Sequence, residues 1–385
     1  MKRKKIVFIV SRFPFPLDKG DKLRAYHQLR FLSQHHDIYL MALHMAPVTA
    51  EARKELEPYC KEIHTFRLQF FTLGWQLIVS IFHQIPMQVG YFFSPSIRKK
   101  IQTLFERISP DTIYCQLSRT ALYAHQATTR HVIDYQDAFS TNYQRIQMQY
   151  RGLKRWFYAR EGRLMKQFEI KMAEWYDACT IISEFDKQQL QHTQHDITVV
   201  PNGVDIDYFT RTASLPTYDL VFSGNLSYIP NQQAALFIIQ ELLPTLKKNK
   251  PDLKVLIAGT SPGSLQQFAD DTLHIPGWMP DIRTAYQSAR IFIAPLFSGA
   301  GMQNKILEAM SMQVPCITTS IVNASINANV GQELLIANSA TEFIDSITSL
   351  LHDTSLQQQL AQNGRLFVEQ KFRWDMANQS LLSIL

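Results

Sequence analysis

The chain has 385 residues, of which 46% are hydrophobic and 19% are charged, and this composition is typical of a folded globular protein and excludes a largely disordered one. Its formal net charge of +6 favours an anionic ligand, a nucleic acid or an acidic membrane surface, without choosing among them. The four cysteines lie far apart and form no CxxC motif, so they indicate neither a zinc site nor a disulfide framework and fit a reducing compartment.

Short apolar runs alternate with helical patterns from the first residues to the last. The run at residues 6–10 is too short for a signal peptide and predicts a first strand. The runs lack strict alternation, as strands buried on both faces of a parallel sheet do. The predicted strands cover residues 5–10, 37–43, 112–117, 131–135, 178–183, 197–201, 218–224, 253–259, 290–296 and 314–320.

A cluster of turn residues between residues 201 and 218 predicts a boundary between two domains. The pattern indicates an α/β protein of two doubly wound, Rossmann-like domains, residues 1–205 and 215–370, that face a central cleft. Residues 371–385 predict a final amphipathic helix that packs on one of the two domains, the N-terminal domain being one choice. In such folds the ligand lies at the carboxyl ends of the strands, so the site is expected there.

One segment near the middle of the first domain has no charged residue between Arg67 and Arg98. We expect either a core helix with a lid over a cleft or an interfacial segment with aromatic and basic anchors. The segment contains no run of about 18 apolar residues, so it does not predict a membrane-spanning helix.

A second unusual segment, residues 145–169, carries seven lysines and arginines with Trp156, Phe157 and Tyr158 among them. A solvated helix face is the simplest interpretation, and contact with anionic lipid is the next. Nucleic acid is not expected as a partner, because no nucleic-acid-binding module accompanies the segment.

The stretch "SGAGMQNKILEAMSMQVPC", residues 298–316, follows a predicted strand and leads into a helix. Small residues allow backbone N–H groups and a helix N-terminus to approach an anion or a sugar hydroxyl. Lys305 and Glu308 share one face of that helix because they are three residues apart. Lys305 suits a phosphate and Glu308 suits a ribose or sugar diol. A routine turn with a solvated ion pair would give the same sequence pattern.

This stretch resembles the donor-binding signature of glycosyltransferase family 4, and further pieces match in the family's order. These pieces are "VVPNGVDIDYF", "FSGNLSYIPNQQA", "LKVLIAG" and "IPGWMPDIRTAYQSARIFIAPL". Near the amino end, "SRFPFPLDKGDKLRAYHQLRFLS" resembles sugar transferases encoded with exosortase-type (PEP-CTERM) systems. The resemblance spans nearly the whole chain and is most specific in its second half.

The resemblance implies a GT-B fold, a nucleotide-diphosphate sugar donor on the second domain and an acceptor on the first. It further implies retention at the anomeric carbon, no metal and no cofactor. Asp137, Lys305 and Glu308 are the predicted catalytic residues. The predicted donor-binding residues are Lys19, Gly20, Gly224, Asn225, Trp278, Met279, Gly299, Gly301, Met302, Gln303, Asn304, Lys305 and Glu308.

Three positions depart from the family pattern. Ala300 stands where a first acidic residue is common, and Asn225 with an uncharged "LSYIPNQQ" stands where an Arg and a Lys are common. Gln136 stands where many members have a His. The diphosphate still needs cations or N–H groups in a desolvated cleft, and Lys305, Lys19, Lys22 and Arg24 are the candidates. Asp18, Asp21 and Asp134 are further acidic residues expected near that cleft.

The sequence therefore predicts a cytoplasmic, metal-independent glycosyltransferase that acts on a glycan or lipid-linked acceptor. For a lipid-linked acceptor we expect a peripheral position on the inner face of the membrane. Two alternatives are a GT-B-fold sugar-nucleotide epimerase and a non-catalytic nucleotide-sugar-binding subunit. The pair Asp205 and Asp207 forms a DxD, but it ends an interdomain turn and is not expected to bind metal.

Overall fold

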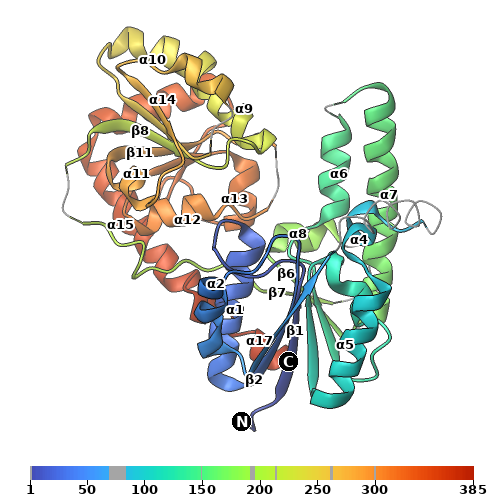
Figure 1. The fold of residues 1–385 in the computed structure, drawn as a ribbon. Helices are drawn as coiled ribbons and strands as arrows, with labels where there is room; N and C mark the ends of the chain where they lie inside the picture. The colour runs from blue at the N-terminus through green and yellow to red at the C-terminus, as the bar shows by residue number, and fades with distance from the viewer. Residues whose placement is uncertain are drawn as a thin grey trace. The chain divides into compact units, whose positions relative to one another are not determined.

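The computed structural model describes residues 2–68, 84–148, 150–190, 196–212, 215–260, 263–298 and 301–385. The chain divides into two compact α/β units (Figure 1). Unit 1 comprises Met1–Pro201 together with Ala377–Leu385, and unit 2 comprises Asn202–Met376. The expected core helix, lid or interfacial segment falls largely on residues 69–83, which lie outside the described residues.

Unit 1 is built on a parallel sheet, which has seven strands within the described residues, in the order β3-β2-β1-β4-β5-β6-β7. The strand order reverses between β1 and β4, so the loops that follow these two strands diverge and leave room for a ligand. The strands are β1 (Lys5–Val10), β2 (Asp37–His44), β3 (Glu62–Arg67), β4 (Thr112–Gln116), β5 (His131–Asp134), β6 (Ala178–Ile181) and β7 (Ile197–Val199).

Alternate residues of β1 enter two separate cores, one on each face of this sheet. Ile6 and Phe8 pack with α1, whereas Val7 and Ile9 pack with α5 and α7. Burial on both faces explains why the run is continuously apolar. The helices are α1 (Gly20–His35), α2 (Ala50–Leu56), α4 (Met87–Phe92), α5 (Pro95–Ile108), α6 (Phe139–Met148), α7 (Gly152–Trp175), α8 (Glu184–Gln189) and α17 (Leu381–Ile384), with 3₁₀ turns at Glu57–Tyr59 and Ser118–Tyr123.

The end of the chain returns to unit 1 through α17. Leu381 is fully buried in the core that α1 shares with β1. The backbone oxygen of Leu385 accepts hydrogen bonds from Thr112 Oγ1 (3.0 Å) and Lys4 Nζ (2.7 Å). The last residues thus add apolar and polar contacts to the first sheet.

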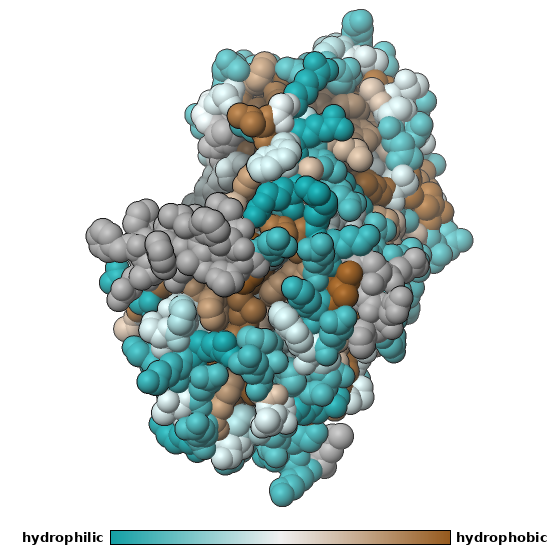
Figure 2. Space-filling view, turned by 90° about the vertical axis from the view of Figure 1, so that its right-hand side faces the viewer, coloured by the Kyte–Doolittle hydropathy of each residue, from teal (hydrophilic) through white to brown (hydrophobic). Residues whose placement is uncertain are grey.

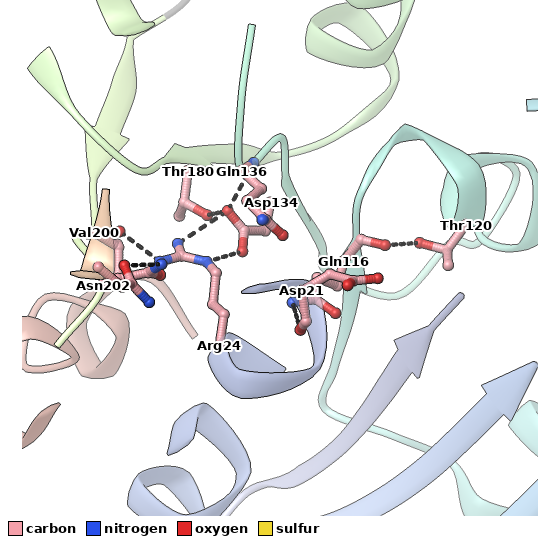
Figure 3. Close-up of polar contacts among 10 residues, drawn as sticks. Asp21, Arg24, Gln116, Thr120, Asp134, Gln136, Thr180, Val200 and Asn202 are labelled. Carbon is pink, nitrogen blue, oxygen red and sulfur yellow. Dashed lines mark hydrogen bonds and ion pairs between the residues drawn. The ribbon is translucent and has the colours of Figure 1, made fainter. Parts of the chain in front are cut away.

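A buried ion pair fixes α1 to the carboxyl edge of the first sheet (Figure 3). Arg24 of α1 donates to Asp134 at the end of β5 through Nε (2.6 Å) and Nη2 (3.1 Å), and its Nη1 donates to the backbone oxygen of Val200 (2.8 Å). Thr180 Oγ1 donates to the same carboxylate, because strand pairing places Thr180 opposite Asp134. Both charged side chains are inaccessible to solvent, so each depends on the other for compensation.

Unit 2 is built on a second parallel sheet, in the order β10-β9-β8-β11-β12-β13 within the described residues. Its strand order reverses between β8 and β11. The strands are β8 (Tyr218–Ser223), β9 (Val255–Ala258), β10 (Leu273–Gly277), β11 (Ala289–Ala294), β12 (Cys316–Thr318) and β13 (Leu335–Ile336).

The helices of unit 2 pack against this sheet around one continuous apolar core. They are α9 (Ile229–Phe237), α10 (Leu243–Asn249), α11 (Arg283–Gln287), α12 (Asn304–Ser311), α13 (Ser320–Ile326), α14 (Ala340–His352), α15 (Thr354–Lys371) and α16 (Trp374–Ala377), with a π turn at Ile238–Leu242 and a 3₁₀ turn at Gly263–Phe268.

Two doubly wound α/β domains are confirmed, but β3, β10 and β13 were not predicted from the sequence. All three lie at or beside the edge of a sheet. In β10 buried and exposed residues alternate, and β13 has only two residues. Edge strands bury one face at most, so they lack the long apolar runs that reveal central strands.

No described helix is both long enough and apolar enough to cross a membrane. On the face that Figure 2 shows, hydrophilic side chains predominate and the hydrophobic ones form small separate patches.

The buried ion pair gives a test of what holds unit 1 together. Asp134→Ala should lower the free energy of unfolding by about 3–5 kcal/mol, because Arg24 would be left buried without a counter-charge. Asp18→Ala, which removes the exposed partner of Lys22, should cost at most about 1 kcal/mol. Chemical denaturation followed by circular dichroism measures both. Equal losses in the two variants would contradict the role of the pair.

Candidate functional site

The carboxyl ends of β8 and β11 bring together the charged residues of α12 and the loop after β8. Lys305 extends its ammonium group to Asn231, whose side-chain oxygen accepts a hydrogen bond at 2.6 Å. The same nitrogen lies 5.1 Å from the centre of the Phe222 ring. Phe222 and Asn231 are both buried, so the ammonium group sits in surroundings of low polarity at the point where strand order reverses.

Burial lowers the pKa of Lys305 to about 7, and the negative charge of Glu308 opposes this shift. No carboxylate contacts the ammonium group in the described part of the chain; Asn231, an uncharged acceptor, is its hydrogen-bond partner. A cation with an uncompensated charge at a strand exit is suited to an anionic ligand.

Two glycines allow the loops to approach this ammonium group. A Cβ on Gly224 would lie 2.7 Å from Lys305 Nζ and 2.9 Å from the Asn231 side chain. Gly259, at the exit of β9, has a φ of +135°, and a Cβ there would lie 1.8 Å from the backbone oxygen of Gly224. Larger residues would therefore displace either the loop or the lysine.

Glu308 lies one helical turn after Lys305 on α12. Its Oε2 accepts a hydrogen bond from the Tyr286 hydroxyl (2.8 Å), and that hydroxyl also lies 3.1 Å from Ser223 Oγ at the end of β8. Burial raises the pKa of Glu308. The chain Ser223–Tyr286–Glu308 fixes the orientation of the carboxyl group. Within the described residues no hydrogen bond reaches its Oε1, which can therefore accept one from a ligand.

The loop before α12 contains four of the other predicted donor residues, Gly299, Gly301, Met302 and Gln303. Gly301 has a φ of +114°, which favours glycine, and α12 begins at Asn304. Asn304 accepts a hydrogen bond from the Asn202 side chain (3.1 Å). Met302 is partly buried against the core. Gly299 and the departure at residue 300 lie outside the described residues.

Gln303 precedes α12 and is partly buried, with its side-chain amide 3.5 Å from the backbone oxygen of Gly301. Trp278 and Met279 follow β10: Trp278 is 69% exposed, whereas Met279 packs partly against the core. An aromatic ring that is this exposed beside a strand end is available for stacking.

Asn225 shapes the loop after β8. Its side-chain oxygen accepts hydrogen bonds from Ser227 N (3.0 Å) and Thr260 Oγ1 (2.8 Å), and its backbone oxygen accepts one from Asn231 Nδ2 (2.9 Å). Asn225 thereby holds Asn231, which in turn holds Lys305.

Unit 1 contributes a second set of predicted residues at its own strand exits. Asp137 follows β5 and is partly buried. Burial, followed by the nearby charge of Asp186, raises the pKa of Asp137 to about 8, so its carboxyl group is largely protonated at neutral pH. Gly20 begins α1, and Lys19 before it is exposed, with no side-chain bond to the helix end.

Two of the candidate cations of unit 1, Arg24 and Lys22, form ion pairs with neighbouring carboxylates. Arg24 is fully buried against Asp134 (Figure 3), so the hypothesis that it contacts a phosphate is wrong. Asp134 is likewise withdrawn from any ligand. Lys22 pairs with Asp18 at 2.7 Å, and Arg12 pairs with Asp21 at 2.9 Å.

Two residues of the unit 2 site were missed from the sequence, Tyr286 and Asn231. Asn231 stands inside the uncharged stretch that departs from the family pattern, and its partner Lys305 supplies a cation to that place from α12. Tyr286 lies in a short helix, and only the fold brings it to Glu308.

A metal site is absent from the described residues, none of which form a group of three or more His, Cys, Asp or Glu side chains. Asp205 of the DxD accepts a hydrogen bond from the backbone nitrogen of Tyr208 (3.0 Å), which is the contact of a turn.

Two family models match the chain, one in each half. The model described as Glycosyltransferase Family 4 matches residues 23–208, and the model described as Glycosyl transferases group 1 matches residues 217–353. An uncharacterized 44.6 kDa protein in the cps region of Klebsiella pneumoniae is 22% identical over 393 residues, which cover 96% of each chain.

Solved structures resemble the whole chain. Sucrose-phosphate synthase from Thermosynechococcus elongatus has a TM-score of 0.73 at 15% identity, over 99% of this chain and 98% of that one. HepE of Anabaena, in complex with UDP and glucose, has a TM-score of 0.70 at 15% identity, over 99% of both chains. At such identities these likenesses show the fold, which is the two-domain GT-B fold.

Proposed function

The chain belongs to the glycosyltransferases, with a family 4 domain followed by a group 1 domain, and from this premise we propose that it transfers a sugar from a nucleotide-diphosphate donor with retention of the anomeric configuration. Its setting is glycan biosynthesis. The proposed acceptor is a glycan or a lipid-linked sugar, and the proposed reaction needs no metal ion.

One observation carries the donor assignment: Lys305 and Glu308 lie on one helix, at the strand exits of unit 2 where strand order reverses. A cation in low-polarity surroundings suits the diphosphate, and an oriented carboxyl group suits the ribose hydroxyls. HepE was crystallised with UDP and glucose, which supports a uridine nucleotide as the first donor to test.

The proposed mechanism relies on positioning and charge. The bond between the anomeric carbon and the diphosphate oxygen breaks while a bond to the acceptor oxygen forms on the same face. The acceptor proton passes to the departing diphosphate, whose charge Lys305 stabilises. Asp137, protonated at neutral pH, would orient an acceptor or sugar hydroxyl by donating a hydrogen bond. Gly20 and Lys19 are proposed neighbours of the donor phosphates.

Nucleotide binding tests this function first. UDP, GDP, ADP and their common sugar conjugates are compared by thermal shift and calorimetry with EDTA present. One nucleotide should bind, and Glu308→Ala should weaken it about tenfold, or about 1.4 kcal/mol, by removing the ribose acceptor. Glu241→Ala removes an exposed carboxylate of the same unit and should change nothing.

Turnover then separates the alternatives. Release of nucleoside diphosphate that depends on an acceptor supports the transferase. Conversion of the donor without any acceptor would indicate an epimerase, and binding without either reaction would indicate a non-catalytic subunit.

The pKa of Lys305 predicts how donor affinity depends on pH. A bound diphosphate favours the charged ammonium and so raises this pKa above its value of about 7 in the free protein. Above pH 7 binding should therefore take up protons, and UDP affinity should fall by up to about tenfold per pH unit. Calorimetry between about pH 7.5 and 9, where the terminal phosphate of UDP is almost entirely ionised, measures both effects.

Lys305→Met should bind UDP weakly and without this pH dependence. Lys254→Met, which removes an exposed cation of unit 2, should retain the full dependence. If UDP affinity in Lys305→Met still depended on pH in the same way, a group other than Lys305 would be responsible for that dependence.

We further propose that the helical hairpin of α6 and α7 contacts an anionic membrane surface. Met148 is the last residue of α6, and Leu153 and Trp156 lie in the first two turns of α7; these side chains are 79%, 86% and 62% exposed. Residues 138–160 include five lysines and arginines and no acidic residue. Exposed apolar side chains among cations favour the interface of an anionic bilayer.

Co-sedimentation with vesicles tests this contact. The protein should bind mixed phosphatidylglycerol–phosphatidylcholine vesicles at low salt and ignore phosphatidylcholine alone. Lys154→Gln should weaken binding roughly fivefold, since one cation near such a surface contributes about 1 kcal/mol. Lys99→Gln, an exposed cation on α5, is the matched control. Equal binding to both vesicle types would exclude the electrostatic contact.

A further inference from the structure

Unit 1 contains a cavity of about 510 Å³ that the donor site does not account for. It lies between the loop that follows β1, the loop that follows β2 and helix α4. Since these loops leave the carboxyl edge of the first sheet next to the point where strand order reverses, the cavity occupies the place where an α/β unit binds its ligand.

The walls of this cavity are mainly apolar and aromatic. They include Phe13, Phe15, Met45, Val48, Tyr91 and Phe92. Phe13 and Phe92 are each 6% exposed and thus fixed in the core, so the apolar surface is part of a packed wall. A ligand that fills this space must present an apolar body to it.

The polar residues of the cavity are cations, hydroxyls and the imidazole of His44, whose Nδ1 lies 2.9 Å from the backbone oxygen of Ala46. Arg12, Lys19 and Lys22 line it, and its described lining contains no Asp, Glu, Asn or Gln. Recognition of an uncharged sugar relies on such carboxylate and amide groups, which can accept hydrogen bonds from its hydroxyls. The lining therefore disfavours a neutral glycan and favours an anion.

Arg12 has donors to spare for that anion. Only its Nη1 contacts Asp21, at 2.9 and 3.2 Å, and the structure records no partner for its Nε or Nη2 among the described residues. Ser11 Oγ beside it is buried without a hydrogen-bond partner in the described chain. Because the Lys22 charge is offset by Asp18, Lys19 gives the cavity a surplus of positive charge.

We propose that this cavity binds the acceptor, and that the acceptor is an amphipathic molecule whose anionic group, a phosphate ester, contacts Arg12 while its apolar body lies against the aromatic wall. The inference rests on the proposed transferase function and chooses a lipid-linked phosphate over a neutral glycan. Lys19 belongs to both the donor and the acceptor proposals, as expected where the two substrates must meet.

Binding of simple probes to the full chain tests the proposal. Decyl phosphate, decanol, decyl maltoside and inorganic phosphate are titrated by calorimetry at concentrations below those at which the amphiphiles form micelles. Decyl phosphate should bind at least about tenfold more tightly than each of the others, because only it combines the anion with the apolar chain. Tight binding of inorganic phosphate alone would reduce the site to a free-anion site, and tighter binding of decyl maltoside would overturn the proposal.

Variants locate the binding. Arg12→Gln should weaken decyl phosphate about tenfold, and Val48→Trp should block it by filling the cavity. Trp156→Ser removes an exposed apolar residue of the α6–α7 hairpin, and Lys99→Gln removes an unrelated cation; neither should change the affinity. Loss of binding in Trp156→Ser with no effect of Arg12→Gln would assign the lipid to the hairpin and contradict the cavity.

UDP binding is measured on the same samples. It distinguishes a failure of the acceptor proposal from a failure of the proposed transferase function. UDP binding that persists while decyl phosphate fails to bind would overturn the acceptor proposal alone. Failure of UDP to bind would count against the transferase function, whatever the lipid probes show. In Val48→Trp, a far-UV circular dichroism spectrum and a thermal unfolding curve like those of the unchanged protein show that unit 1, which carries the substitution, is folded.

Discussion

The carboxyl edge of the first sheet depends on the buried pair between Arg24 and Asp134. Two charges in an apolar interior cost several kcal/mol each unless every polar group finds a partner. Here Asp134 accepts from Arg24, from Thr180 and from the backbone of Gln136, and Arg24 also holds Val200. The pair joins α1 to the ends of β5 and β7, and therefore helps to fix the position of the helix into which the loop after β1 leads.

In the second unit, the corresponding constraint is the space beneath Gly224. A single Cβ there would meet the ammonium group of Lys305, so the glycine leaves the space that this ammonium group fills. This contact gives a physical meaning to the missing Arg and Lys after β8: Asn231 occupies that region and receives a cation from α12 instead. The residues after β8 thus differ from the family pattern, but the exit of this strand still carries a positive charge. Burial brings the pKa of that cation near neutrality, which makes the charge sensitive to what binds.

The two sites differ in what sequence patterns could reveal. Lys305 and Glu308 are close in sequence and share a helix face, so their spacing alone indicated a joint role. Arg24 and Asp134 are separated by 110 residues, and nothing in the local sequence shows that they neutralise each other. For the same reason Arg24 was expected to be available to a phosphate. The cavity of unit 1 is assembled from three separate segments, and Arg12 gains its place there only when the loops after β1 and β2 lie side by side.

The sequence by itself determined the two α/β domains, their central strands and the small-residue loop before the Lys305 helix, because apolar runs, turn residues and helical spacing are local properties of the chain. Edge strands such as β3 and β10 were not predicted from the sequence, since a strand with one buried face leaves only a weak local pattern. The tertiary structure decided which charges are neutralised in ion pairs inside the protein and which remain available to a ligand. It did so because burial and pairing depend on residues that are distant in sequence and that meet only at the carboxyl edges of the folded sheets.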